Sequence, residues 1–218
     1  MFIIFFYLRT IWGFTRGVEI LLENKANEYH LDNSKLGILH YAAKGNAECL
    51  SLILKKIRKF THFRDSFGAF PTHYAAEGKK ECLAGNSFVE LTLISLSIVL
   101  LDSTIKELVV DCVDFEGSTP LMYASTSGSD ECVKYLINMG ANVGLRDYQG
   151  ATALHYAAAE GKLECIKALL EGKASTEAVD RKGWPPLLYA DFGAKNEAIK
   201  TLLEANPNQL SILGFLIR

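Results

Sequence analysis

The chain has 218 residues, of which 49% are hydrophobic and 22% are charged, and its formal net charge is -2 at pH 7. This composition is typical of a folded protein and excludes an intrinsically disordered chain. Because there is no basic surplus to neutralise a phosphate backbone, we expect no nucleic-acid partner.

An apolar segment opens the chain and runs from Met1 to Trp12, with its apolar run interrupted at Arg9. The run is too short to span a bilayer, and it lacks the basic stretch and small-residue cleavage site of a secretory signal. A second apolar segment, Phe88 to Leu101, contains Glu90 and is more typical of a buried element. We therefore expect a cytoplasmic protein without a membrane partner. Membrane association through the N-terminal apolar segment stays open as an alternative.

A sequence pattern recurs along most of the chain at a fixed interval. Successive anchor positions of the pattern stand 33, 49, 33 and 33 residues apart. Three identical intervals out of four indicate an internal repeat, and a repeat of this length governs the fold of the whole chain. The anchor residues are His40, His73, Met122, His155 and Leu188.

The segment around His155 shows what each repeat is expected to form. Apolar and small residues stand there at i, i+3 and i+4, which places them on one face of a first helix. A second helix follows with its own apolar face, and Gly161 between the two is a candidate C-cap. Such a helix pair cannot bury its apolar faces alone, so neighbouring pairs must stack. The two faces consist of Leu154, Ala157 and Ala158, and of Ile166, Leu169 and Leu170.

These repeated segments resemble ankyrin repeats. The best match runs from Asp147 to Ala174, and the repeat that begins at Asp114 matches nearly as well. The resemblance implies an all-α solenoid of stacked helix-turn-helix units with β-hairpin or loop tips, with about six repeats, some of them degenerate. The residues of the best match that fit the family pattern are Asp147, Gly150, Thr152, Leu154, His155, Ala157, Ala158, Gly161, Glu164, Leu169, Leu170 and Ala174.

The repeat spacing also predicts how the chain is divided. Residues 1–31 form a degenerate first repeat, 32–64 a second, and 65–113 a third that is interrupted by an insert at 84–100. Residues 114–146, 147–179 and 180–212 form the fourth to sixth repeats, and 213–218 are a truncated tail. The insert is compatible with an extra helix and with an irregular bulge. The tail suggests a fragment of a longer protein or an altered gene product.

Cysteine and histidine recur at repeat positions, which gives them structural explanations. The thiols of one repeat slot are too far apart for disulfides and lack the spacing of a zinc pair. The resemblance implies that the histidines hydrogen-bond the adjoining loop. No nucleotide-binding or hydrolase motif is present, so we expect no enzyme activity, metal, cofactor or small-molecule substrate. The residues concerned are Cys49, Cys82, Cys132 and Cys165, with Cys112 outside the row, and His40, His73 and His155.

Two sets of residues are candidates for binding a partner protein. The residue after each anchor is always tyrosine and would line a concave groove of inner helices, although it could instead stay hidden against the next repeat. The loop tips carry aromatic and basic side chains, of which Trp184 could instead fill the turn before its helix. The tyrosines are Tyr41, Tyr74, Tyr123, Tyr156 and Tyr189, and the tip residues are Phe67, Phe115, Tyr148, Arg181 and Trp184.

The resemblance implies a non-catalytic scaffold or adaptor that binds another protein through its tips and its concave face. Two alternatives stay open. The chain could be the ankyrin arm of a larger membrane-associated polypeptide such as a channel, or of an enzyme such as a ubiquitin ligase, because similar stacks are fused to such domains.

Overall fold

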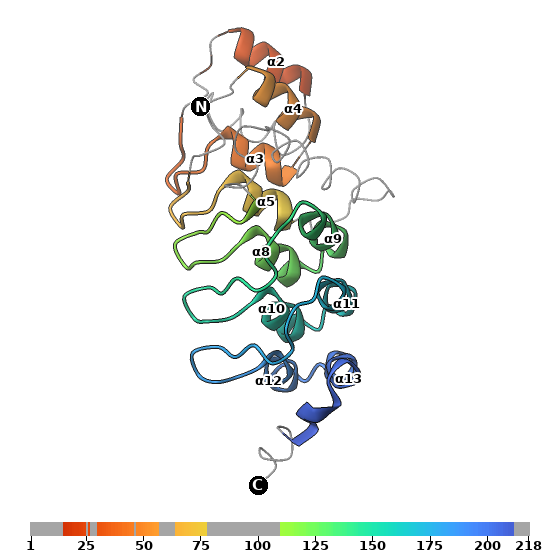
Figure 1. Cartoon of the computed structure of the whole chain (residues 1–218). Coiled ribbons are helices and arrows are strands. Elements are labelled where there is room, and N and C mark those ends of the chain that lie inside the picture. Colours follow the sequence, from red (N-terminus) through yellow and green to blue (C-terminus); the bar gives the residue numbers. More distant parts are fainter. Residues whose placement is uncertain are drawn as a thin grey trace. The chain divides into compact units, whose positions relative to one another are not determined.

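The structure is a computed structural model that describes residues 15–24, 26, 30–45, 47–56, 64–77 and 110–211 (Figure 1). The chain divides into two compact units, unit 1 (Met1–Phe115) and unit 2 (Glu116–Arg218). All regular secondary structure in the described ranges is helical, which confirms the all-α class predicted from the sequence.

Unit 1 contains four helices in its described part. They are α2 (Thr15–Glu23), α3 (Ile38–Gly45), α4 (Ala47–Lys56) and α5 (Pro71–Glu77). Helix α3 packs against both α4 and α5, and α2 packs against α4. The core of this unit combines small residues with larger aliphatic ones, which lets short helices approach closely. Its fully buried members include Ala42, Leu50, Ile53, Ala75 and Ala76.

Unit 2 is built from helix pairs arranged in two layers (Figure 1). The inner layer consists of α8 (Pro120–Ser127), α10 (Ala153–Glu160) and α12 (Pro186–Phe192), with α10 in contact with both of its neighbours. The outer layer consists of α9 (Asp130–Asn138), α11 (Leu163–Glu171) and α13 (Asn196–Ala205), with α11 in contact with both of its neighbours. A 3-10 turn, η1 (Pro207–Gln209), follows α13. Long loops project from the inner layer on the side away from the outer helices (Figure 1).

The ends of the inner helices follow from their sequence. Thr119 is the N-cap of α8, its hydroxyl accepts the N–H of Met122 at 3.3 Å, and Pro120 occupies the first helical position. Helix α10 ends at Gly161 in the left-handed conformation, with φ of +67°, as predicted for this C-cap. The glycine turns the chain sharply, so the outer helix can fold back on the inner one.

The apolar faces predicted for the segment around His155 lie in the core of unit 2. Leu154, Ala157 and Ala158 are fully buried, as are Ile166 and Leu169 of α11. Leu170 was expected to share that face, but it is only half-buried. At 100° per residue Leu170 lies to one side of the line of Ile166 and Leu169, at the edge of the contact.

Several sequence predictions fall outside the described ranges. The N-terminal apolar segment from Met1 to Trp12, the insert at 84–100, Cys82 and residues 212–218 are among them. The number of six repeats and the exact repeat boundaries therefore stay predictions. The described loops carry turns and no strand, so the β-hairpin form of the tips is not confirmed.

Candidate protein-binding surface

An aspartate organises each of four described loop turns. In the turn at Asp147, one carboxylate oxygen accepts the N–H groups of Gln149 and Ala151, each at 2.8 Å. The other oxygen accepts the hydroxyl of Tyr156, nine residues later in the inner helix. The same arrangement recurs at Asp32, Asp65 and Asp180. Each turn is thus fixed to its own inner helix by a single carboxylate.

Hydrogen bonding lowers the pKa of two of the turn carboxylates, Asp32 and Asp180. Burial alone would raise the pKa of Asp180, but the N–H groups of Trp184 and Lys182 and the hydroxyl of Tyr189 outweigh it, so the pKa is lowered. The pKa of Tyr189 is raised to about 12, first by burial and then by the hydrogen bond to Asp180. The pair therefore holds as carboxylate and neutral phenol throughout the physiological pH range.

Successive turns are joined by one backbone hydrogen bond and by a ring that rests on a glycine. The N–H of Phe115 donates to the carbonyl of Phe67 in unit 1, and the N–H of Tyr148 donates to the carbonyl of Glu116 in unit 2, both at 2.9 Å. A Cβ on Gly117 would lie 2.8 Å from the Tyr148 ring, and φ of Gly117 is +80°. Only glycine combines this backbone conformation with room for the ring.

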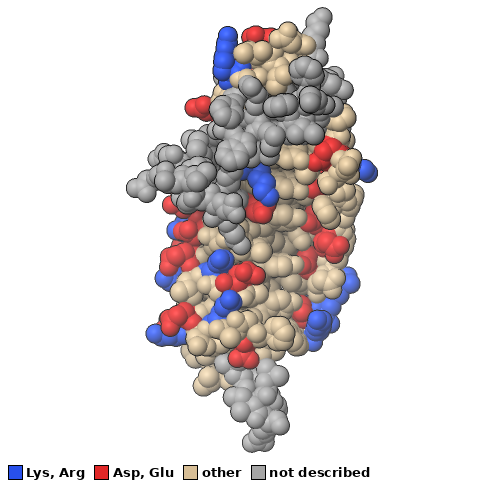
Figure 2. All heavy atoms as spheres, turned by 180° about the vertical axis from the view of Figure 1, so that it is seen from behind, with Lys and Arg blue, Asp and Glu red and all other residues tan. Residues whose placement is uncertain are grey.

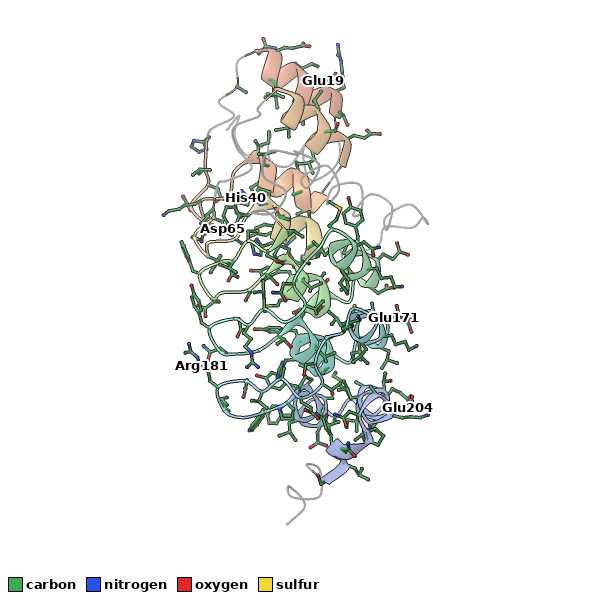
Figure 3. The ribbon with its side chains drawn as sticks, viewed as in Figure 1. Glu19, His40, Asp65, Glu171, Arg181 and Glu204 are labelled. Carbon is green, nitrogen blue, oxygen red and sulfur yellow. The ribbon has the colours of Figure 1, made fainter. Side chains whose placement is uncertain are left out.

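The aromatic tip side chains remain largely exposed despite these contacts. Phe67 is 67% exposed, Phe115 is 56% exposed and Tyr148 is 54% exposed. Arg181 lies at the end of its loop (Figure 3) and is exposed, whereas Trp184 is half-buried. The structure therefore brings Phe67 and Phe115 onto adjacent turns of unit 1, and Tyr148 and Arg181 onto adjacent turns of unit 2.

The tyrosines that follow the anchor positions (the tyrosine row) have a structural role that was not expected from the sequence. The hydroxyls of Tyr41, Tyr74, Tyr156 and Tyr189 are all donated to the aspartate nine residues earlier. All five tyrosines of the row are half-buried. Because four hydroxyls serve the turns, what these side chains can offer to a partner is mainly ring surface.

The recurring histidines connect one loop to the next. His155 accepts the N–H of Thr152 at Nδ1, at 3.0 Å, and its Nε2 lies 3.0 Å from the carbonyl of Trp184 in the following loop. His40 makes the corresponding contacts with Gly37 at 3.1 Å and Ala69 at 3.2 Å. Since Nδ1 accepts an amide proton, the hydrogen must be on Nε2, which donates to the carbonyl.

One exposed aromatic residue was left out of the site predicted from sequence. Phe192, at the end of α12, is 84% exposed and lies with its ring centroid 6.1 Å from that of Trp184. The sequence could have indicated this residue, because the other repeats hold Lys44, Glu77, Thr126 and Ala159 at the position of Phe192. A large aromatic side chain where other repeats place small or polar ones marks a local departure from the pattern.

The described cysteines have the properties of buried structural thiols. Cys49, Cys132 and Cys165 are buried. Burial raises the pKa of Cys132 and Cys165 to about 12, so little thiolate forms at neutral pH. Within the described ranges, His, Cys, Asp and Glu side chains form no group of three or more that could hold a metal ion. None of the helices in that part of the chain has the length and apolarity needed to cross a bilayer.

The outer helices of unit 2 present charges of both signs close together. Lys134 pairs with Asp130 at 2.9 Å on α9, and Lys167 pairs with Glu164 at 2.7 Å on α11. Figure 2 shows Lys and Arg intermixed with Asp and Glu on the face of unit 2 seen from behind. These exposed pairs are typical of a solvated surface, so the loop side of the unit is the better candidate for binding.

Comparison with known proteins places part of unit 2 in a family. Residues 121–170 match the model of a family described as ankyrin repeats (many copies). The matched segment begins in α8, covers α9 and α10, and ends within α11. A search of curated proteins gave no match to the chain.

Proposed function

Because this chain is an ankyrin-repeat protein, we propose that it is a non-catalytic scaffold or adaptor that binds another protein through its loop tips. Ankyrin repeats generally mediate protein–protein interactions and are generally non-catalytic. The observation that carries the proposal is the exposure of aromatic side chains on turns whose backbones are held in place. Rigid aromatic anchors bind at low entropic cost, so they are frequent hot spots of interfaces.

The tyrosine-bearing face of the inner helices has a secondary part in this proposal. The tyrosines there keep partly exposed rings, but four of their hydroxyls are donated to the turn aspartates. A partner on that face would therefore contact ring surface. We expect the loop tips to contribute more of the binding free energy than the tyrosine row.

A pull-down with tip variants tests the proposal. We would compare the full-length chain with a variant that carries Phe115→Ala and Tyr148→Ala, and measure recovery of co-purified proteins by quantitative mass spectrometry. Loss of the proteins specific to the wild-type chain is expected, because both substitutions remove an exposed loop ring, Phe115 in unit 1 and Tyr148 in unit 2.

The matched control changes two exposed residues of the outer helices, Lys134→Ala and Glu171→Ala. Both variants must keep the wild-type circular dichroism spectrum and melting temperature. Equal recovery from the wild-type chain and the tip variant would refute binding through the tips. A loss with the control variant alone would assign binding to the outer helices.

The proposal places the protein in the cytoplasm. Among the described cysteines, Cys112, Cys132 and Cys165 are free thiols, which agrees with a reducing compartment. Fractionation of cells that express a tagged chain is expected to give a soluble pool. Recovery only in the membrane pellet, released by detergent and not by salt, would favour anchoring through the N-terminal apolar segment instead.

A further inference from the structure

Two aromatic side chains in the last described helix pair depart from the repeat in the same place. Trp184 and Phe192 occupy the positions held 33 residues earlier by Ala151 and Ala159. Ala151 is buried, whereas Trp184 is half-buried and Phe192 is 84% exposed. Since alanine satisfies both positions in the preceding pair, the fold of the pair does not require the two rings.

The backbone of Trp184 is held on both sides. Its N–H donates to a carboxylate oxygen of Asp180 at 2.8 Å, and its carbonyl accepts Nε2 of His155 at 3.0 Å. Its ring stands edge-on to Tyr189, with centroids 6.3 Å apart, and is tilted by 52° to the ring of Phe192. The ring is thus fixed before any partner arrives, so a contact with it loses little conformational entropy.

Positive charge borders these rings. Arg181 and Lys182 are both exposed in the same turn, and Lys182 Nζ lies 5.7 Å from the ring centroid of Trp184. Figure 3 shows Arg181 at the loop end away from the helices. The carboxylate of Asp180 is occupied by two N–H groups and the Tyr189 hydroxyl. Asp191, which precedes Phe192 on α12, is turned from it by about 100° around the helix axis.

We propose that Arg181, Lys182, Trp184 and Phe192 form a docking patch for an acidic peptide segment of a partner protein that carries a large apolar side chain between its carboxylates. This inference rests on the proposed function and specifies the chemistry of the partner. The apolar side chain covers the Trp184 and Phe192 rings, and the carboxylates pair with Arg181 and Lys182.

Charge complementarity favours an acidic segment over a second copy of this chain. A two-fold contact between two copies of the patch would gather Arg181 and Lys182 of both copies in one interface. Like charges in a closed contact oppose association. A segment of opposite charge gains from the same arrangement.

Selection from a random peptide library displayed on phage tests the inference. The full-length chain is the target, and peptides that also bind a Trp184→Ala, Phe192→Ala variant are removed. This variant has alanine at both positions, as the preceding helix pair does, so we expect it to fold. A thermal melting curve checks that it is folded. The surviving peptides should be enriched in Asp and Glu around Trp, Phe or Leu.

The charge requirement is then measured with the most enriched peptide, synthesised with a fluorescent label. Binding by anisotropy should weaken on the order of tenfold with Arg181→Glu and Lys182→Glu, and it should weaken as salt is added. The control Lys200→Glu changes an exposed charge on α13 and should leave the affinity unchanged.

Three results would overturn the inference. They are selected peptides without acidic residues, peptides whose binding is unaffected by the charge reversals, and a dimer in sedimentation that the Trp184→Ala, Phe192→Ala variant abolishes. None of these three results affects the pull-down with the Phe115→Ala, Tyr148→Ala variant, because that variant keeps the rings of Trp184 and Phe192. Failure of this docking patch and failure of the proposed function are therefore distinguishable.

Discussion

At the scale of single residues, each turn depends on a carboxylate that serves two elements at once. Asp147 accepts two N–H groups of its own turn at one oxygen and the hydroxyl of Tyr156 at the other. The hydroxyl thereby links the loop to helix α10. Replacing it by hydrogen leaves the ring packed but removes the donor from a charged, largely buried acceptor.

We therefore expect Tyr156→Phe to lower the free energy of unfolding by about 1–3 kcal/mol, measured in urea. Tyr148→Phe is the matched control, because the Tyr148 side chain is 54% exposed at the loop tip. The control should change stability by less than about 0.5 kcal/mol. Equal effects of the two substitutions would show that the link between Asp147 and Tyr156 adds nothing to stability.

His155 gives a second prediction at this scale. Burial lowers its pKa, although the hydrogen bond to the Trp184 carbonyl offsets part of the effect. The folded pKa is therefore below the unfolded value of about 6.5. The stability that neutral His155 provides is complete above that value and is lost as the pH falls from it towards the folded pKa.

The 15N chemical shifts of the His155 imidazole report its protonation state and tautomer directly. At about pH 7.5, above the unfolded pKa of about 6.5, we expect the shifts of a neutral ring with its hydrogen on Nε2, since Nδ1 accepts the N–H of Thr152. The free energy of unfolding should decrease as the pH falls below about 6.5. Shifts of a charged ring, or of the opposite tautomer, would contradict the assigned hydrogen bonds.

At the scale of the elements, the turns need glycine for its positive φ and, at some positions, for the space that a neighbouring ring occupies. Substitutions at two glycines can distinguish these reasons. Gly117 and Gly183 occupy the same position of two turns, and both have φ of +80°. A Cβ at Gly117 would meet the Tyr148 ring at 2.8 Å, whereas a Cβ at Gly183 would meet nothing within 4 Å. We expect Gly183→Ala to cost about 1–2 kcal/mol for the backbone alone.

Gly117→Ala should cost about 1 kcal/mol more, since the ring or the turn must move. Thermal unfolding of both variants, followed by circular dichroism, measures the difference. If the two variants melt at the same temperature, the ring of Tyr148 does not rest on Gly117 in solution.

A substitution at the contact between inner helices should lower stability more than the glycine substitutions do. Ala157 of α10 is fully buried. Ala157→Glu places a carboxylate in that contact without a partner, and we expect a loss of about 3–5 kcal/mol that unfolds the helix pair. Ala205→Glu, at the exposed end of α13, is the control and should be nearly neutral. An unchanged melting curve of the Ala157→Glu variant would refute the placement of this helix.

The sequence predicted the elements better than the connections between them. Spacing alone predicted the buried face of Leu154, Ala157 and Ala158, because helical periodicity is local. The bond between Tyr156 and Asp147 was missed, because it joins a loop to a helix nine residues later and depends on how the turn folds back. Phe192 was missed because repeat periodicity directs attention to shared residues, whereas its exposure comes from a departure.

At the scale of the whole molecule, each unit presents loops whose backbones are fixed and whose aromatic side chains are exposed. In unit 2 the outer helices carry paired charges of both signs, and the loops carry Tyr148, Arg181 and Trp184. A partner is therefore expected on the loop side. Rigid turns, rather than folding upon binding, would provide the specificity.

Site-specific photo-crosslinking tests this central claim most directly. A benzoylphenylalanine placed at Tyr148 is compared with one at Glu171 on outer helix α11, which Figure 3 shows on the side away from the loops. Irradiation in cells, followed by mass spectrometry, identifies what each probe touches. We expect a defined partner protein to be captured from position 148 and not from position 171. Capture from position 171 alone, or no specific protein from either position, would contradict binding through the loop tips.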